Sequence, residues 1–185
     1  MVCVEFYLSW ERSFKVILSL GIVGLGLIGA SLSWDFLRWP RRGFVKGFDV
    51  DRSVLEKAKQ KGLIDYQASS AAEAADDVDL VFIATPVRAV PGVFFEIKEV
   101  LSGGTLVLDM GSTRSWVYQQ IKPFLGNHLY AGFHPMAGGE KGGFDEARAG
   151  LFKGAPVLIT PFSPLEDKVA LIDEIVNFLG GKVFF

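Results

Sequence analysis

Two short stretches of the sequence combine side chains that can move a proton. Ser112 and Arg114 follow an apolar run in LDMGSTRS, and His134 ends another in GFHPMAGG, which leads on to Glu140. An imidazole can take the proton of a hydroxyl whose carbon gives up hydride, and a serine hydroxyl can orient the same oxygen. His134 and Ser112 are therefore a candidate catalytic pair, with Glu140 placed to tune the histidine or close the pocket. The same spacing also suits a turn histidine before a proline and a serine that caps a helix.

A glycine-rich stretch further upstream has the spacing G-x-G-x-x-G. It consists of Gly24, Leu25, Gly26, Leu27, Ile28 and Gly29. Between a strand and a helix, the first glycine allows a tight turn, the second lets the backbone approach a diphosphate, and the third lets the helix pack closely on the strand. The start of that helix then offers unpaired N–H groups to phosphates. The stretch therefore predicts a dinucleotide site.

An acidic residue follows this stretch at the distance expected for a ribose contact. Asp49 ends the next strand-like run, 20 residues after Gly29. A carboxylate there would bind the adenosine ribose hydroxyls and repel the 2′-phosphate of NADP, which favours NAD. Asp51 competes for the same role, and Arg52 can instead accommodate a phosphate, so NADP remains possible. Asp49 could also serve only as a turn or helix-capping residue.

Thr85 and Pro86 end another apolar run, DLVFIATP. In an open parallel sheet, ligands bind beyond the carboxyl ends of the strands, where the strand order reverses. We expect these two residues to lie at that point and to contact the cofactor. A plain end to the strand explains them equally well.

Apolar runs alternate with helix-like segments through most of the chain. We predict strands over 16–24, 44–50, 79–86, 105–112, 129–135, 154–161 and 182–185, and helices over 27–39, 52–62, 69–78, 87–101, 113–125 and 164–180. Strands that are apolar on both faces and alternate with helices are typical of a parallel sheet covered on both sides. The fold class predicted is α/β: a Rossmann-type, doubly wound, mostly parallel sheet with helices on both faces. Because the carboxyl ends of parallel strands share one edge, this sheet would gather all the candidate residues.

The run from Val16 to Trp34 has no charged residue and is 19 residues long, near the span of a bilayer. It contains four glycines and three serines, and its glycines do not follow the G-x-x-x-G spacing of membrane helix contacts. A buried strand followed by a helix explains the run better than a membrane span does. A signal anchor is the minor alternative.

The length and composition fit one domain. The net charge of −2, with both signs spread along 185 residues, gives no reason to expect nucleic acid or an anionic membrane as partner. Cys3 is the only cysteine, which fits a reducing, cytoplasmic setting. No metal site is predicted. Residues 1–14 precede the first strand and are interpreted as an N-terminal extension, and 15–185 as an NAD(P)-binding Rossmann domain.

Four segments together resemble the prephenate dehydrogenase family, which includes arogenate dehydrogenases: VGLGLIGASL, TPVR, DMGSTR and HPMAGGEKGGFDEARAGLF. The last is the most specific. The resemblance implies NAD(P)-dependent oxidative decarboxylation of prephenate or arogenate in tyrosine biosynthesis, a part of aromatic amino acid biosynthesis. It implies that His134 and Ser112 contact the substrate hydroxyl. It also implies that Arg114, where many members have lysine, and Glu140 belong to the substrate pocket.

The sequence departs from this family at its end. Members continue into a helical domain that makes a homodimer, closes the pocket and supplies an arginine for a substrate carboxylate, whereas this chain stops at GGKVFF. We expect the chain alone to bind cofactor and to dehydrogenate poorly. One alternative is a dinucleotide-binding module, or a truncated remnant, without catalysis. Another is a 3-hydroxy acid dehydrogenase, whose catalytic lysine would lie on a later helix.

Overall fold

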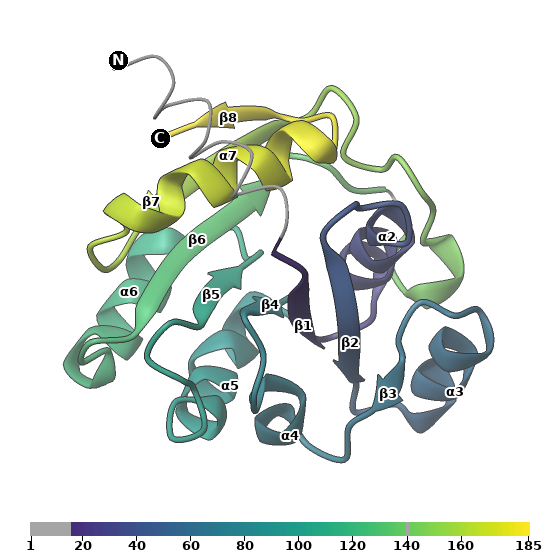
Figure 1. Ribbon diagram of the computed structural model, residues 1–185, viewed down its shortest axis with the longest axis horizontal. Helices are drawn as coiled ribbons and strands as arrows, with labels where there is room; N and C mark the ends of the chain where they lie inside the picture. Colours follow the sequence, from purple (N-terminus) through teal and green to yellow (C-terminus); the bar gives the residue numbers. More distant parts are fainter. Residues whose placement is uncertain (1–15, 140) are drawn as a thin grey trace.

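One mixed sheet is the framework of the molecule. The computed structural model describes residues 16–139 and 141–185, so the expected extension over 1–14 and Glu140 lie outside the described residues. Within them, eight strands form one sheet in the order β3-β2-β1-β4-β5-β6-β7-β8 (Figure 1). The strands are β1 (Leu18–Val23), β2 (Arg42–Phe48), β3 (Tyr66–Gln67), β4 (Leu80–Ile83), β5 (Leu106–Asp109), β6 (Leu129–Pro135), β7 (Pro156–Pro161) and β8 (Lys182–Phe184). Neighbouring strands are parallel except β6 and β7, which are antiparallel, so the predicted mostly parallel sheet is confirmed.

The strand order reverses beside β1. The chain runs from β1 outward to β2 and β3, then returns to place β4 on the other side of β1. A crevice forms at such a reversal because the connections leave the two neighbouring strands in opposite directions. The carboxyl ends of β1 and β4 flank it, next to the glycine-rich stretch and Thr85.

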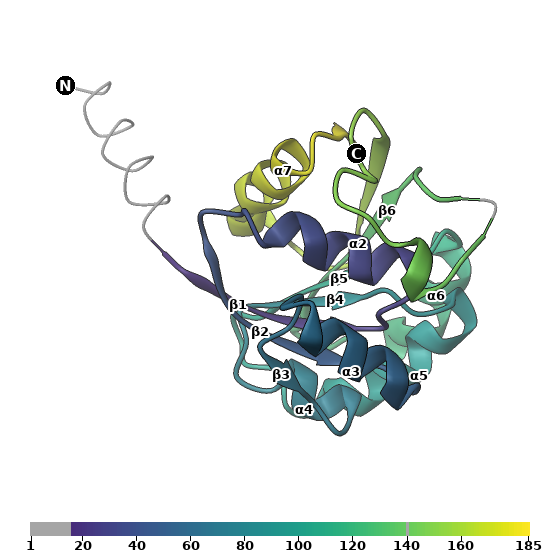
Figure 2. The same cartoon turned by 90° about the vertical axis from the view of Figure 1, so that its right-hand side faces the viewer.

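Helices cover both faces of the sheet, as Figure 2 shows for α2 and α7 on one side and α4 and α5 on the other. The α-helices are α2 (Leu27–Phe36), α3 (Arg52–Gln60), α4 (Ala71–Ala75), α5 (Val90–Ile97), α6 (Arg114–Ile121) and α7 (Val169–Phe178); the short 3-10 turns are η1 (Val87–Ala89), η2 (Lys122–Phe124), η3 (Phe144–Glu146) and η4 (Glu166–Lys168). Alternate strand residues face one of two cores. Leu80 and Phe82 of β4 pack with α2, α3 and α7, whereas Val81 and Ile83 pack with α4, α5 and α6.

The uncharged run that resembled a membrane span is divided between two elements. β1 takes its first half and α2 its second, and most residues of both are buried in the protein. Among the described residues, the structure has no helix of the length and apolar character that a bilayer span requires.

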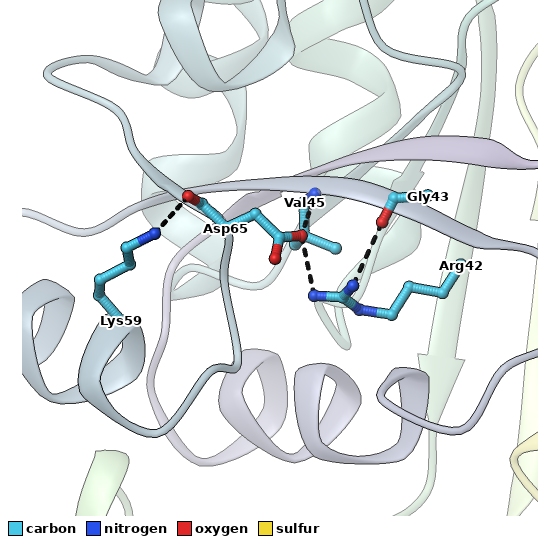
Figure 3. A network of polar contacts seen from close by, with 5 residues as sticks. All are labelled: Arg42, Gly43, Val45, Lys59 and Asp65. Atoms are coloured by element: carbon cyan, nitrogen blue, oxygen red, sulfur yellow. Dashed lines mark hydrogen bonds and ion pairs between the residues drawn. The ribbon is translucent and has the colours of Figure 1, made fainter.

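Hydrogen bonds at helix starts and strand ends explain several boundaries. Ser70 caps α4, because its hydroxyl accepts from the N–H of Glu73 at 3.0 Å. Asp65 ties the turn after α3 to β2: one carboxylate oxygen accepts from Arg42 Nη2 and from the N–H of Val45, each at 2.9 Å (Figure 3). Lys59 Nζ of α3 donates to the backbone oxygen of Asp65 at 2.6 Å. This network holds β2, the strand that leads to Asp49.

The predicted elements are present, but β3 and η3 were not predicted, and three of the predicted helices each contain a 3-10 turn: η1 in 87–101, η2 in 113–125 and η4 in 164–180. β3 was not predicted, because a strand of two exposed residues is too short to form an apolar run. The helix predicted over 87–101 begins with the tight turn η1 and becomes α-helical at Val90, with Pro91 in its first turn. Proline fits there because the first N–H groups of a helix have no partner within it.

Candidate functional site

The glycine-rich stretch forms a tight turn from β1 into α2. Gly24 has φ of +92°, a conformation that side chains disfavour, and a Cβ there would lie 2.8 Å from the carbonyl carbon and oxygen of Ala84 on the neighbouring strand connection. A Cβ on Gly29 would lie 1.9 Å from the backbone oxygen of Gly24, so this glycine lets α2 pack against the turn. The first and third glycines are therefore required by the fold itself.

Gly26 differs from these two glycines. A Cβ there would meet no atom within 4 Å, so the fold leaves open space beside it. Gly26 also occupies the N-cap position of α2, which has no side-chain cap and no acidic residue in its first turn. The first N–H groups of α2 therefore have no side-chain partner and carry the partial positive charge of a helix start. Open space and free N–H groups together suit an anion.

Asp49 and Asp51 have different partners. Asp49 is half-buried after β2, and its carboxylate accepts from the N–H of Leu25 in the glycine turn at 2.7 Å and from the N–H of Asp51 at 3.0 Å. Asp51 caps α3 and accepts from the N–H and hydroxyl of Ser53 at 2.9 and 2.7 Å. These bonds hold the pKa of Asp51 below its ordinary value. The helix-capping role thus belongs to Asp51, and Asp49 lies against the turn.

Thr85 and Pro86 lie between the glycine turn and the loop that follows β5. They follow β4, and Ala84, just before them, contacts the place a Cβ on Gly29 would occupy. The hydroxyl of Thr85 is buried and has no hydrogen-bond partner among the described residues. Such an orphaned group usually has a partner that the protein itself does not supply. Val87, in the turn that follows, packs close to Gly111.

The second part of the site lies where β5 and β6 end. Asp109, the last residue of β5, pairs with Gly132, so β6 continues beyond its neighbour and carries His134 past the end of β5. His134 is half-buried and lies opposite Leu158 of β7. Burial, and then the positive charge of Arg114, lower the pKa of His134. The imidazole is therefore held toward its uncharged form, which can accept a proton.

Ser112 is exposed in the loop between β5 and α6. α6 begins at Arg114 with Thr113 at the N-cap position, and no side chain caps it. The helix-cap alternative for Ser112 therefore fails, because the serine lies one residue too early. Its hydroxyl stands in a loop at the same edge of the sheet as His134.

Arg114 lies beneath this edge rather than on its surface. Its Nη1 is 2.9 Å from both carboxylate oxygens of Asp109, which is completely buried. Burial raises the pKa of Asp109, and the charge of Arg114 opposes that effect only in part. Tyr130 adds a buried hydroxyl beside this carboxylate, and burial followed by the charge of Asp109 raises the pKa of Tyr130 well above its ordinary value.

The segment after His134 is fastened to the dinucleotide side of the molecule. The N–H of Arg148 donates to the Ser31 hydroxyl of α2 at 3.1 Å, and the N–H of Gly150 donates to Asp35 at 2.7 Å. Lys57 of α3 pairs with Asp145 at 3.0 Å. The segment passes beside α2 and α3 (Figure 1). Sequence reasoning missed these anchors, although polar Ser31 in an apolar helix was an available signal.

Apart from Glu140, which lies outside the described residues, the structure brings the predicted residues together at one edge of the sheet, in two groups. The glycine turn, Asp49 and Thr85–Pro86 lie at the ends of β1, β2 and β4, and Ser112, Arg114 and His134 lie at the ends of β5 and β6. His128, the other histidine of the chain, precedes β6 and packs edge-on against Phe94, with ring centroids 6.0 Å apart.

Comparison with known proteins decides the family. The profile described as prephenate dehydrogenase, nucleotide-binding domain, matches residues 35–185. The chain belongs to the prephenate dehydrogenase family. The resemblance carried by its motifs is confirmed, and the Rossmann-type fold class with it.

Relatives of this family member include proteins with three related names. Cyclohexadienyl dehydrogenase of Zymomonas mobilis is 30% identical over 166 residues, which are 89% of this chain and 56% of the relative. Prephenate dehydrogenase from Aquifex aeolicus, in complex with hydroxyphenyl propionate and NAD+, has a TM-score of 0.82 at 28% identity and is matched over 91% of this chain and 59% of that chain. Arogenate dehydrogenase from Synechocystis has a TM-score of 0.79 at 28% identity, over 90% and 58%. The chain therefore spans between 56% and 59% of these three proteins.

Proposed function

We propose that this protein takes part in the NAD(P)-dependent oxidative decarboxylation of prephenate or arogenate, and that the chain supplies the cofactor domain and part of the active site. The proposal rests on two observations taken together. The chain matches the family, and of the three glycines in the turn only Gly26 has open space beside it. The three relatives are named for dehydrogenation of this kind of substrate, and one was solved with NAD+.

The residues present fit a dinucleotide. The space beside Gly26 and the uncapped start of α2 would hold the diphosphate through backbone N–H groups, with Gly24, Leu25, Leu27, Ile28 and Gly29 forming the turn. The unpartnered hydroxyl of Thr85 would gain a hydrogen bond, with Pro86 fixing the backbone beside it. A nicotinamide dinucleotide, when bound there, supplies a hydride acceptor.

NAD is the preferred cofactor in this proposal. Asp49 uses its carboxylate to accept from Leu25 and Asp51, yet two carboxylate oxygens offer about four acceptor positions. The remaining positions suit ribose hydroxyls, which are donors. A 2′-phosphate would instead meet like charge. Arg52 is exposed at the start of α3 and is the feature that would favour NADP.

The chain's own residues manage the proton of the substrate hydroxyl. Ser112 holds the hydroxyl oxygen, and the uncharged imidazole of His134 accepts its proton as hydride leaves the same carbon. When carbon dioxide then leaves, the electron pair of the broken carbon–carbon bond enters the ring and makes it aromatic, and the ring oxygen takes the proton back from His134. The lowered pKa of His134 keeps the imidazole available as a base near neutral pH.

The chain spans little more than half of its relatives, so we assign the rest of the pocket to residues beyond it. A helical domain would supply the homodimer interface and a cation for the substrate carboxylate. Glu140 would border the same pocket. Turnover of prephenate with NAD by the 185-residue chain should accordingly be poor, and robust turnover would contradict the need for a further domain.

Thermal unfolding of the chain with NAD or NADP tests the cofactor proposal. A ligand that binds only the folded state at 100 times its Kd adds about 2.7 kcal/mol of stability, which raises the Tm. We expect NAD to raise the Tm more than NADP at equal concentration. His134→Asn should leave the NAD effect intact, since the imidazole acts on substrate. If neither dinucleotide changes the Tm, the proposal is wrong. If NAD binds but no helical partner restores turnover, the chain is a binding module without catalysis.

A further inference from the structure

Arg114 is wedged between two strands. It is the first residue of α6, and its side chain turns back toward the ends of β5 and β6. Besides the carboxylate of Asp109, Nη1 contacts the backbone oxygen of that residue at 3.3 Å. On the other side lies Gly132 of β6, where a Cβ would be only 2.3 Å from Nη1. A side chain at that position would displace the guanidinium, so Gly132 and Arg114 fit each other.

The Arg114 side chain contacts both elements that carry the candidate catalytic pair, the loop of Ser112 and the strand of His134. The Asp109–Arg114 contact closes the short loop that contains Ser112, and the N–H of Gly111 donates to the same carboxylate at 3.0 Å. Gly132 and His134 lie on the same face of β6, because residues two apart in a strand share a face. They are about 7 Å apart along the strand. The guanidinium therefore lies one strand repeat below His134.

We propose that Arg114 is a positioning residue, which fixes the Ser112 loop against the strand of His134 and places a permanent positive charge beneath the imidazole. The proposal rests on the proposed function, in which His134 must accept a proton. Arg114 then acts through His134 and Ser112 and does not itself contact the substrate.

The charges around His134 support this role. Among the described residues, the charged and titratable groups on its face are Arg114 from α6, Asp109 from β5 and Tyr130 from β6, while β7 contributes the apolar Leu158. Asp109 engages only one guanidinium nitrogen. Arg114 Nε and Nη2 are buried without a partner among the described residues, so the positive charge is incompletely balanced. That charge disfavours a second one on the imidazole and lowers the pKa of His134.

Titration of the two histidines by NMR tests the proposal on the full 185-residue chain. His128 and His134 are the only histidines, so a His128→Gln variant assigns both ring signals. His128 precedes β6, away from Arg114, and serves as the internal reference. Arg114→Lys keeps the charge, Asp109→Asn keeps the cation but removes its counter-ion, and the double variant Asp109→Asn with Arg114→Met removes both charges. The double variant is expected to stay folded, because it leaves no unpaired charge in the core.

The expected result is an upward shift of the His134 pKa in the double variant alone, with the His128 value unchanged. Arg114→Lys should retain the wild-type value, and Asp109→Asn should leave the His134 pKa at or below it. Either of two results would overturn the proposal: no shift in the double variant, or an equal rise in Asp109→Asn, since loosening of the loop rather than lost charge would then be the cause.

A cofactor titration on the same samples separates this inference from the proposed function. NAD should raise the Tm of every variant to a similar extent, because Arg114 lies beneath the proton-transfer end. NAD binding with an unresponsive His134 would reject the positioning role and leave the cofactor proposal standing. Absence of NAD binding by the wild type would reject the proposed function whatever His134 does.

Discussion

Asp49 and Asp109 each follow or end a parallel strand at the same edge of the sheet, yet they are used in opposite ways. Asp49 is half-buried, and its partners are two backbone N–H groups, which leave acceptor positions open. Asp109 is fully buried and directs both oxygens to Arg114. One end of the crevice is thus built to receive hydrogen-bond donors from a ligand. The other end uses its carboxylate internally, to set the position and charge of neighbouring side chains.

A place at the carboxyl end of a strand therefore does not by itself determine what an acidic side chain does. What decides the role is whether the neighbouring strand leaves room for a cation beside the carboxylate. The pairing of Asp109 with Gly132 opens room for the guanidinium of Arg114, whereas no arginine or lysine contacts Asp49 among the described residues.

The largest effect is expected from breaking the buried pair on either side. Arg114→Met leaves Asp109 as an uncompensated buried charge and should lower the free energy of unfolding by about 3–5 kcal/mol. Asp109→Asn should cost at least as much, because a buried guanidinium cannot lose its proton, whereas a freed carboxyl whose pKa burial already raises can take one up. The double variant Asp109→Asn with Arg114→Met removes both charges and should lose less stability than either single variant. Urea unfolding of the three variants measures this, and a double variant less stable than both single variants would contradict the expectation.

Two glycines of the same turn, Gly29 and Gly26, allow a matched pair of alanine substitutions near Asp49. Gly29→Ala puts a methyl group 1.9 Å from the oxygen of Gly24 and should cost about 3 kcal/mol of stability through overpacking. Gly26→Ala meets open space, so its free energy of unfolding should stay within about 1 kcal/mol, the scale of alanine–glycine differences. Its methyl group, however, fills the proposed diphosphate space, and NAD binding should be lost.

Calorimetry with NAD, beside urea unfolding, checks this pair. If Gly26→Ala binds NAD like the wild type, the diphosphate does not lie at the turn.

A smaller effect separates Asp49 from Asp51. Asp49→Ala removes charge-assisted hydrogen bonds to the ribose, each of about 1.5–3 kcal/mol, so NAD affinity should fall about 10- to 100-fold. Asp51→Ala removes the α3 cap and should cost about 1 kcal/mol of stability while NAD affinity is unchanged. Isothermal titration of the two variants decides between them, and a larger affinity loss in Asp51→Ala would reverse the assignment.

The smallest effect is expected at Glu73, an acidic residue outside the candidate site that can be compared with Asp49 and Asp109. Hydrogen bonds from Ser69 and Tyr66 lower the pKa of Glu73 from 4.5 to about 2. The ionised form is thus favoured by folding, so this stabilisation is present above the unfolded pKa and is lost as the pH falls toward 2. Glu73→Gln should be less stable than wild type at pH 7, and the difference should shrink as the pH falls below 4.5. A constant difference in urea unfolding across this range would exclude the pKa as its cause.

Much of the fold could be predicted because its signals are local. β6 begins and ends at the predicted residues 129 and 135, and the glycine turn lies where its spacing indicated. The choice between Asp49 and Asp51 was open, since it depends on the residue at which α3 begins. The Asp109–Arg114–Gly132 arrangement could not be predicted, because it depends on the register of β5 against β6, which no local pattern specifies.

We expect a bound dinucleotide to lie along the carboxyl edge of the sheet, from the turn at Gly26 to His134. Two-dimensional NMR of the labelled chain during NAD addition measures this placement. Shifts are expected in the amide signals of residues 24–29, Asp49 and Thr85 and in the ring signal of His134, with His128 unaffected. If NAD binds saturably and the amides of residues 24–29 do not change, the dinucleotide does not lie at the glycine turn.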